Sequence, residues 1–161
     1  MDILQFAGEY RFLSNFWLSP VQLDGVMYPT VEHAYQAAKT ADVGARRQIQ
    51  ACPTPGQAKR MGRHVPIRPD WESSKLEVMY SLVRQKFRDP ELGRRLLATG
   101  RDALIEGNEW GDRYWGVCRG TGENHLGRIL MRVRQEIAPP IQNAGARVHV
   151  VAPAAHADGA S

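Results

Sequence analysis

Residues 29–39 read Pro29-Thr-Val-Glu-His-Ala-Tyr-Gln-Ala-Ala-Lys39. The apolar residues of this stretch recur at i, i+3, i+4 and i+7, the spacing of one helix face: Val31, Ala34, Tyr35 and Ala38. We therefore predict a helix from Val31 to about Thr40, with Thr30 as its N-cap. A helix of this kind needs a core to cover its apolar face, and from this stretch onward the pattern is mainly helical.

The same helix carries a polar stripe made of Glu32, Gln36 and Lys39, at i, i+4 and i+7. Glu32 and Lys39 are two turns apart, roughly 10 Å along the axis. They are too far apart for a close ion pair but could hold opposite ends of one small substrate. The alternative is an ordinary solvated helix face. His33 projects elsewhere, and we expect it at the surface or behind the site rather than as a base.

Other segments predict a mainly α fold with minor β structure. Asp24-Gly25 is typical of a tight turn between strands at Pro20–Leu23 and Val26–Tyr28. Further helices are expected, each opened by a capping residue: from Thr54-Pro55 to Met61, from Asp70 to about Arg88, from Asp89-Pro90 to about Gly100, and from about Asn124 to Ile137. The inward face expected for the long helix is Leu76, Met79, Tyr80, Val83 and Phe87.

The ends of the chain and the region between the last two helices are less regular. Ile3–Phe6 is expected to be irregular or a short strand, and Ala103–Glu106 and Tyr114–Cys118 to form a small strand pair. One compact domain is predicted for residues 1–138. Residues 139–161, rich in alanine and small polar residues, are predicted to be a disordered tail.

Composition narrows the class of protein. The 161 residues are 43% hydrophobic and 24% charged, typical of one soluble globular domain. With no apolar run of membrane-spanning length and no signal peptide, we expect a cytoplasmic protein without membrane contact. The net charge of +4 favours anionic partners, but the basic residues are scattered, which argues against nucleic-acid binding as the sole function.

Motifs for metal and nucleophile chemistry are missing from the sequence. Cys52 and Cys118 belong to no CxxC pair, and there is no HExxH, GxSxG or Cys/His cluster. The sequence therefore gives no support to a metallohydrolase or a serine hydrolase, and we expect no metal and no cofactor.

A second candidate stretch is Leu104-Ile-Glu-Gly-Asn-Glu-Trp-Gly-Asp-Arg-Tyr-Trp-Gly116. It places Glu106, Glu109 and Asp112 beside Trp110 and Trp115 in a loop punctuated by glycine. Aromatic faces can stack on a base or a sugar, and carboxylates can bind ribose hydroxyls or move protons. Either tryptophan could instead be a core anchor. Together with the amine and carboxylate of the first helix, the loop suits cleavage of a nucleoside-like bond, in which positive charge develops at the ribosyl C1 atom.

A third stretch, Gly120-Thr-Gly-Glu-Asn-His-Leu-Gly127, runs into the last helix. Backbone amides at a helix N-terminus can bind a phosphate. The commoner alternative is a simple helix cap made by Asn124.

In order along the chain, these segments resemble the NADAR (YbiA-like) family over about residues 6–137. The matching text includes Phe12-Leu-Ser-Asn-Phe16, the EHxxQxxK element from Glu32 to Lys39, Lys86-Phe87, the DxxWG element from Asp112 to Gly116, and Gly122-Glu-Asn-His-Leu-Gly127. One departure is Cys118, where the family more often has glycine.

The resemblance implies a mainly α fold and N-glycosidase activity on ribosylated bases. Two substrate classes are associated with the family: phosphoribosylamino-pyrimidine intermediates of riboflavin synthesis, and ADP-ribosylated guanine in nucleic acid. It also implies that Lys39 forms a Schiff base with the opened ribose, which requires an unprotonated amine. The partners expected are therefore a small nucleotide-like substrate or ADP-ribosylated nucleic acid.

The resulting hypothesis assigns catalysis to Glu32, Lys39 and Asp112. The residues expected to bind substrate are Asn15, Phe16, Tyr35, Gln36, Trp71, Glu106, Trp110, Trp115 and Asn124. The alternatives are a non-catalytic module that binds ADP-ribose or NAD derivatives and, last, a nucleic-acid-binding protein. The oligomeric state stays open.

Overall fold

The computed structural model describes residues 1–140. Within them, six α-helices and one 3-10 helix surround two small two-stranded sheets, so the fold is mainly α with minor β structure. The elements in chain order are η1 Gly8–Leu13, β1 Val21–Leu23, β2 Val26–Tyr28, α1 Val31–Ala38, α2 Val43–Gln50, α3 Pro55–Met61, α4 Trp71–Lys86, α5 Pro90–Leu97, β3 Gly107–Asn108, β4 Val117–Cys118 and α6 His125–Ile137.

The N-terminal hairpin and α1 form where their sequences predict them. Strands β1 and β2 pair antiparallel, with Val21 opposite Tyr28. The turn between them places Asp24 and Gly25 at φ values of 47° and 79°, the left-handed backbone that an Asp-Gly pair tolerates. Thr30 caps α1, because its side chain accepts a hydrogen bond from the His33 backbone N–H.

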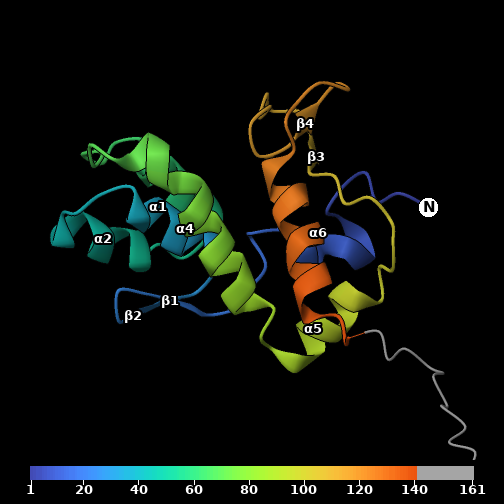
Figure 1. Ribbon diagram of the computed structural model, residues 1–161. Helices are drawn as coiled ribbons and strands as arrows, with labels where there is room; N and C mark the ends of the chain where they lie inside the picture. Colours follow the sequence, from blue (N-terminus) through green and yellow to red (C-terminus); the bar gives the residue numbers. More distant parts are fainter. Residues whose placement is uncertain (141–161) are drawn as a thin grey trace, which may run out of the picture.

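Helix α1 lies at the centre of one half of the molecule. It packs against α2, α3 and α4, while α4 also contacts α6, and α6 contacts α5 (Figure 1). Helix α4 therefore joins the two halves: α1, α2 and the hairpin lie on one side of it in Figure 1, and α5 and α6 on the other. All eight residues of α1 are buried, which leaves this helix no solvated face.

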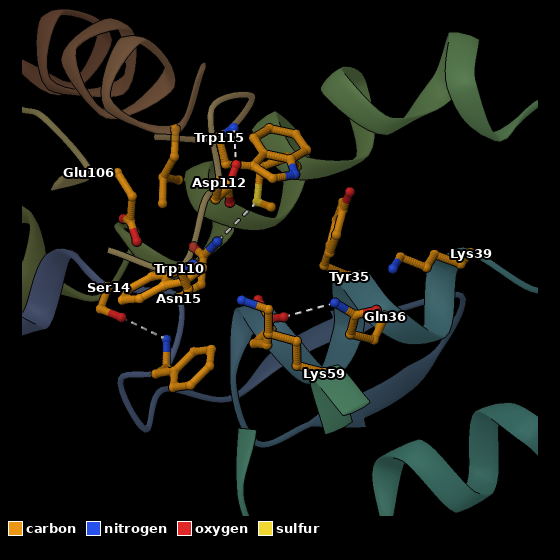
Figure 2. Close-up of a pocket in the computed structure, with 14 residues that line it drawn as sticks. Ser14, Asn15, Tyr35, Gln36, Lys39, Lys59, Glu106, Trp110, Asp112 and Trp115 are labelled. Atoms are coloured by element: carbon orange, nitrogen blue, oxygen red, sulfur yellow. Dashed lines mark hydrogen bonds between the residues drawn. The ribbon is translucent and has the colours of Figure 1, made fainter. Parts of the chain in front are cut away.

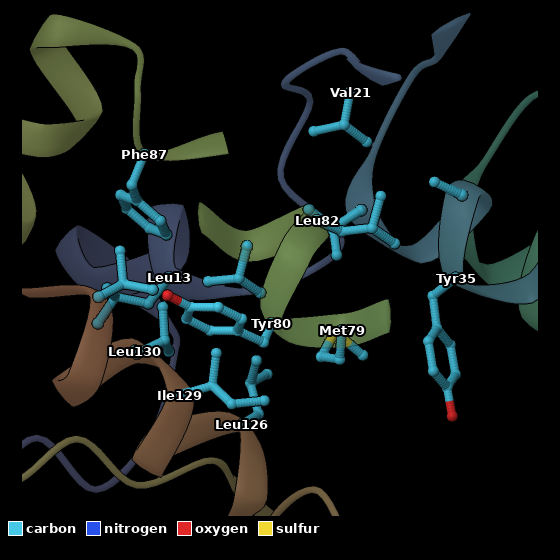
Figure 3. Close-up of a cluster of buried hydrophobic side chains, with 14 of the residues drawn as sticks. Leu13, Val21, Tyr35, Met79, Tyr80, Leu82, Phe87, Leu126, Ile129 and Leu130 are labelled. Atoms are coloured by element: carbon cyan, nitrogen blue, oxygen red, sulfur yellow. The ribbon is translucent and has the colours of Figure 1, made fainter. Parts of the chain in front are cut away.

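The core runs along α4 between these halves (Figure 3). Met79, Val83 and Phe87 point into it as predicted, and Leu13 and Leu130 meet them from η1 and α6. The prediction for Leu76 is wrong, since this side chain is 41% exposed. Leu82 is buried instead, because α4 is covered on two sides, by α1 and by α6.

Several local predictions are corrected. Helix α2 was not predicted, because it buries only Ile49 and so shows no apolar stripe. Residues 3–6 are irregular, as expected, with Ile3 in an isolated bridge to Leu104, and the 3-10 helix η1 that follows them was not predicted. The small strand pair exists, but it is parallel and lies at Gly107–Asn108 and Val117–Cys118.

One predicted helix cap is absent. Asp70 makes no side-chain cap hydrogen bond at the start of α4, because its carboxylate binds Arg68 and Ser74 instead. Thr54 and Asp89 do cap α3 and α5, as their sequences predict. Of the predicted tail, residues 141–161 lie outside the described residues. Across residues 1–140, no helix has the length and apolar character needed to cross a membrane.

Candidate active site

A cavity of about 240 Å³ opens where the segment after η1, one face of α1, helix α3 and the 106–115 loop meet (Figure 2). It gathers the polar stripe of α1 and the aromatic acidic loop, which are some 70 residues apart in sequence. The lining residues are Ser14, Asn15, Phe16, Glu32, Tyr35, Gln36, Lys39, Lys59, Met79, Glu106, Trp110, Asp112, Trp115 and Leu126.

The polar stripe of α1 forms one wall of the cavity and is not a solvated face. Glu32 and Gln36 are 7% and 4% exposed, and the Gln36 Nε2 atom donates a hydrogen bond of 2.8 Å to Glu32 Oε1. The Gln36 Oε1 atom is buried without a hydrogen-bond partner among the described residues. Gly62 packs directly on this amide, since a Cβ atom there would lie 1.9 Å from Gln36 Oε1.

Burial shifts the two ionisable groups of this wall in opposite directions. Burial raises the pKa of the Glu32 carboxyl, and the hydrogen bond from Gln36 and the Lys59 charge only partly offset this. Burial lowers the pKa of the half-buried Lys39 amine, and the nearby Arg63 and Lys59 charges lower it further, against the opposing effect of Glu32. Uncharged forms of both groups are therefore more populated here than in water.

The segment from Ser14 to Phe16 forms the floor of the cavity. The Asn15 carbonyl accepts a hydrogen bond from the Glu32 N–H, and the Asn15 amide lies 3.5 Å from Met79 Sδ. The Ser14 carbonyl accepts a hydrogen bond of 2.8 Å from the Lys86 ammonium, which approaches from α4. Phe16 is partly exposed at the rim.

The opposite wall carries two carboxyls with different surroundings. Asp112 Oδ1 accepts hydrogen bonds from the backbone N–H groups of Tyr114 and Trp115, at 3.1 and 2.9 Å. Asn108 holds the Asp112 backbone through both atoms of its amide. By contrast, Glu106 Oε2 is buried with no hydrogen-bond partner among the described residues. Burial, followed by the charges of Asp112 and Glu32, raises the pKa of Glu106 to about 7.

Aromatic rings close the remaining sides. Tyr35 packs edge-on against Trp115, with ring centroids 5.4 Å apart, and also against Trp71 at 5.2 Å. Trp110 is 65% exposed at the mouth, where the Lys59 ammonium lies 5.3 Å from its ring centroid. Trp71 is buried behind Tyr35 and does not line the cavity.

Asn124 also lies outside the cavity, in a bracing position. Its backbone has φ 53°, and its side chain makes no helix cap. It instead accepts from the Glu106 N–H and donates to the Leu104 carbonyl, at 3.0 and 2.9 Å. Asn124 therefore holds the segment that carries Glu106, next to strand β3.

The structure gives little support to a phosphate site at the start of α6. The backbone N–H groups of residues 123–126 all donate to carbonyls of residues 113–116, so none of these four donors is free for an anion. His33, expected at the surface or behind the site, is buried. It is 1% exposed, and its ring nitrogens bond Thr30 Oγ1 and the Cys52 carbonyl.

Sequence reasoning missed several residues of the site. Lys59 comes from the short helix α3, and Met79 and Leu126 are core residues whose edges reach the cavity. No local pattern distinguishes them, because only the packing of α3, α4 and α6 brings them to the site. Within residues 1–140, no group of three or more His, Cys, Asp or Glu side chains could hold a metal ion.

Comparisons with known proteins identify the family. The NADAR domain model matches residues 5–138. The chain is 42% identical over 136 residues to the N-glycosidase YbiA of Escherichia coli, covering 82% of this chain and 84% of that protein. It is 38% identical over 133 residues to a riboflavin biosynthesis protein of Vibrio vulnificus, covering 80% of this chain but only 36% of that longer protein.

A solved structure is similar as well. The NMR structure of E. coli YbiA superposes with a TM-score of 0.73 at 38% identity, covering 84% of this chain and 83% of that one. The match to the family model spans most of the chain. The chain therefore belongs to the NADAR domain family, and with its N-glycosidase relatives it is a hydrolase of N-glycosyl bonds.

Proposed function

We propose that the cavity binds a ribosylated base and hydrolyses the bond between the ribosyl C1 atom and the base nitrogen. The observation that carries this proposal is that two walls of the cavity bring complementary groups together. A carboxyl and an amine on α1 face two further carboxyls and an indole across a cavity of about 240 Å³. Such a set can stabilise positive charge at C1, supply a nucleophile and move protons.

Lys39 is the proposed nucleophile. A lysine attacks carbon only as the neutral amine, and burial at this position lowers its pKa, which increases the neutral fraction at neutral pH. Its lone pair attacks C1 of the ribose as the C1–N bond breaks, and the electron pair of that bond leaves with the base, which takes up a proton. The C1–O4 bond then breaks as a proton moves from the lysine nitrogen to the ring oxygen, which gives an imine. Water hydrolyses the imine and returns the free amine and the free sugar. This step needs only water as a co-reactant.

Glu32 and Asp112 are the proposed acid–base and electrostatic groups. Glu32 has a raised pKa, so it can take up a proton from the ribose side and return it. Asp112 is held by two backbone N–H groups, the arrangement that suits a fixed carboxylate, and it stabilises the charge that develops at C1. Asn15 and Gln36 line the wall and floor between them and are proposed to bind ribose hydroxyls.

The size of the cavity supports the proposal that only part of the substrate lies inside it. A volume of about 240 Å³ is smaller than the roughly 300–1,000 Å³ of pockets that enclose drug-sized ligands. The ribosyl group therefore occupies the interior between Tyr35, Trp115 and the carboxyls, and the base or the rest of the substrate stacks on the exposed Trp110. Trp71 contributes indirectly, by supporting Tyr35.

The substrate is proposed to be a phosphoribosylamino-pyrimidine or a guanine ADP-ribosylated in nucleic acid. The first is favoured by the name of the Vibrio relative, which is a riboflavin biosynthesis protein. The decisive experiment incubates the protein in parallel with both compounds and follows the released base or ADP-ribose. Release from one compound identifies the substrate. Tight binding of ADP-ribose in a calorimeter with no product from either would instead favour the binding module.

A further inference from the structure

Lys86 and Glu106 are two ionisable side chains to which the mechanism above gives no step: Lys86 is buried and bonds the floor of the cavity, and Glu106 is half-buried and lines it. Lys86 is 2% exposed, and the only hydrogen bond of its ammonium among the described residues goes to the Ser14 carbonyl. An ammonium has three donors, so this one is under-bonded for a buried charge. Glu106 Oε2 is buried and unbonded as well.

Only one of the two side chains lines the cavity. Glu106 lines it directly, and Lys86 holds Ser14, which also lines it. In the part of the chain that the structure describes, no carboxylate lies within 4 Å of the Lys86 nitrogen, so the two groups do not form a contact ion pair. They are nevertheless close enough for each charge to shift the pKa of the other.

The surroundings of the two carboxyls of the 106–112 loop favour different protonation states. Asp112 receives two backbone N–H bonds, which stabilise a carboxylate, whereas Glu106 receives none at its buried oxygen. Two carboxyls in one site whose surroundings differ in this way usually divide the acid and base roles. A protonated Glu106 would have its O–H group available inside the cavity.

We propose that Glu106 is the acid that protonates the departing base, and that Lys86 is a positioning residue that holds the Ser14–Phe16 floor. This rests on the proposed function. As the C1–N bond breaks, its electron pair leaves with the base nitrogen, which takes the Glu106 proton. The water that completes the hydrolysis loses a proton, and that proton restores the acid.

The pKa values agree with this geometry. Burial raises the pKa of Glu106 to about 7, so its acid form is abundant up to neutral pH and is lost above it. Burial lowers the pKa of Lys86 to about 7. A positive charge at Lys86 favours the carboxylate form of Glu106, so its removal must raise the pKa of Glu106 further.

The test measures Glu106 directly and then its effect on turnover. In protein labelled with 13C at the glutamate carboxyls, the NMR signal that Glu106→Gln removes is titrated from pH 4 to 9. We expect a midpoint near 7 in the unmodified protein and a midpoint at higher pH in Lys86→Met. Arg84→Met, which removes an exposed cation from the same helix, is the control and should leave the midpoint unchanged.

Turnover is measured across the same pH range with both proposed substrates. We expect kcat to fall as pH rises through the Glu106 midpoint, this falling limb to move to higher pH in Lys86→Met, and Glu106→Gln to lose at least about 100-fold in kcat, the usual contribution of a general acid. Lys86→Gln keeps a donor for Ser14 but no charge. In Lys86→Gln, kcat should fall at the same higher pH as in Lys86→Met, and this variant should fold better than Lys86→Met. If Lys86 were purely structural, the pH at which kcat falls would not change.

The outcomes separate the two proposals. A Glu106 midpoint near the ordinary glutamate value of roughly 4.3, or a Glu106→Gln variant with full kcat, overturns the inference even if the protein is an active glycosidase. The predicted titration with no product from either substrate instead overturns the proposed function and leaves Glu106 established as a buried acid.

Discussion

Replacement of Gln36 by leucine should destabilise the protein increasingly as pH rises. Gln36 donates its 2.8 Å hydrogen bond to a carboxyl whose pKa burial has already raised. Because folded Glu32 holds its proton more tightly than unfolded Glu32, its contribution to stability is lost as pH rises through the folded pKa. The bond from Gln36 offsets part of that loss, and leucine, of similar size, removes the offset.

The magnitude follows from the difference between a charged and a neutral hydrogen bond. A bond to a charged group contributes about 1.5–3 kcal/mol and a neutral one about 0.5–1.5 kcal/mol, so the pH-dependent part of the cost is about 1 kcal/mol. The unbonded Gln36 Oε1 atom is removed too, which is favourable, but that gain is the same at every pH. The slope of the cost against pH therefore isolates the bond to the Glu32 carboxylate.

Urea unfolding of the unmodified protein and of Gln36→Leu, at intervals from pH 5 to pH 9, measures this slope. Other titrating groups cancel in the difference between the two proteins. The control is Gln85→Leu, since Gln85 is half-buried and its amide bonds only the backbone of Gln22, so its cost should not vary with pH. A Gln36→Leu cost that is constant from pH 5 to pH 9 would refute Glu32 as an ionising group stabilised by Gln36.

Four further variants test the site and the core. Lys39→Arg keeps the charge but cannot form an imine, so it should lose turnover and the adduct trapped by borohydride, whereas a trapped adduct in this variant would contradict the assigned nucleophile. Trp110→Ala should change the free energy of unfolding by less than about 0.5 kcal/mol and raise KM roughly tenfold, in keeping with about 1–3 kcal/mol for stacking on a base. Gly62→Ala should cost about 1–3 kcal/mol in urea unfolding and lower kcat, because its Cβ must displace Gln36; equal stability and kcat would contradict the packing. Leu130→Ala, at a fully buried position, should cost about 2–5 kcal/mol with kcat unchanged at temperatures where the protein stays folded.

Local sequence signals are reliable where a few neighbouring residues define where a turn or a helix begins. The Asp-Gly turn, the Thr30, Thr54 and Asp89 caps, and the period of α1 each act over a few residues, and the structure confirms them. Helix α2 was missed for the complementary reason. It buries a single side chain, Ile49, so its sequence has no apolar period to detect.

The sequence by itself determined which chemical groups this protein has available: a carboxyl, an amide and an amine on one helix stripe, and carboxyls beside tryptophans in one loop. Only the tertiary structure decided the burial and the hydrogen-bond partners of each group. Packing of α1 on all sides buries Glu32 and Gln36, Gly62 closes over the Gln36 amide, and the 113–116 carbonyls occupy the amides at the start of α6. Burial, proton affinity and free hydrogen-bonding capacity depend on atoms distant in the chain, so no local pattern of residues can encode them.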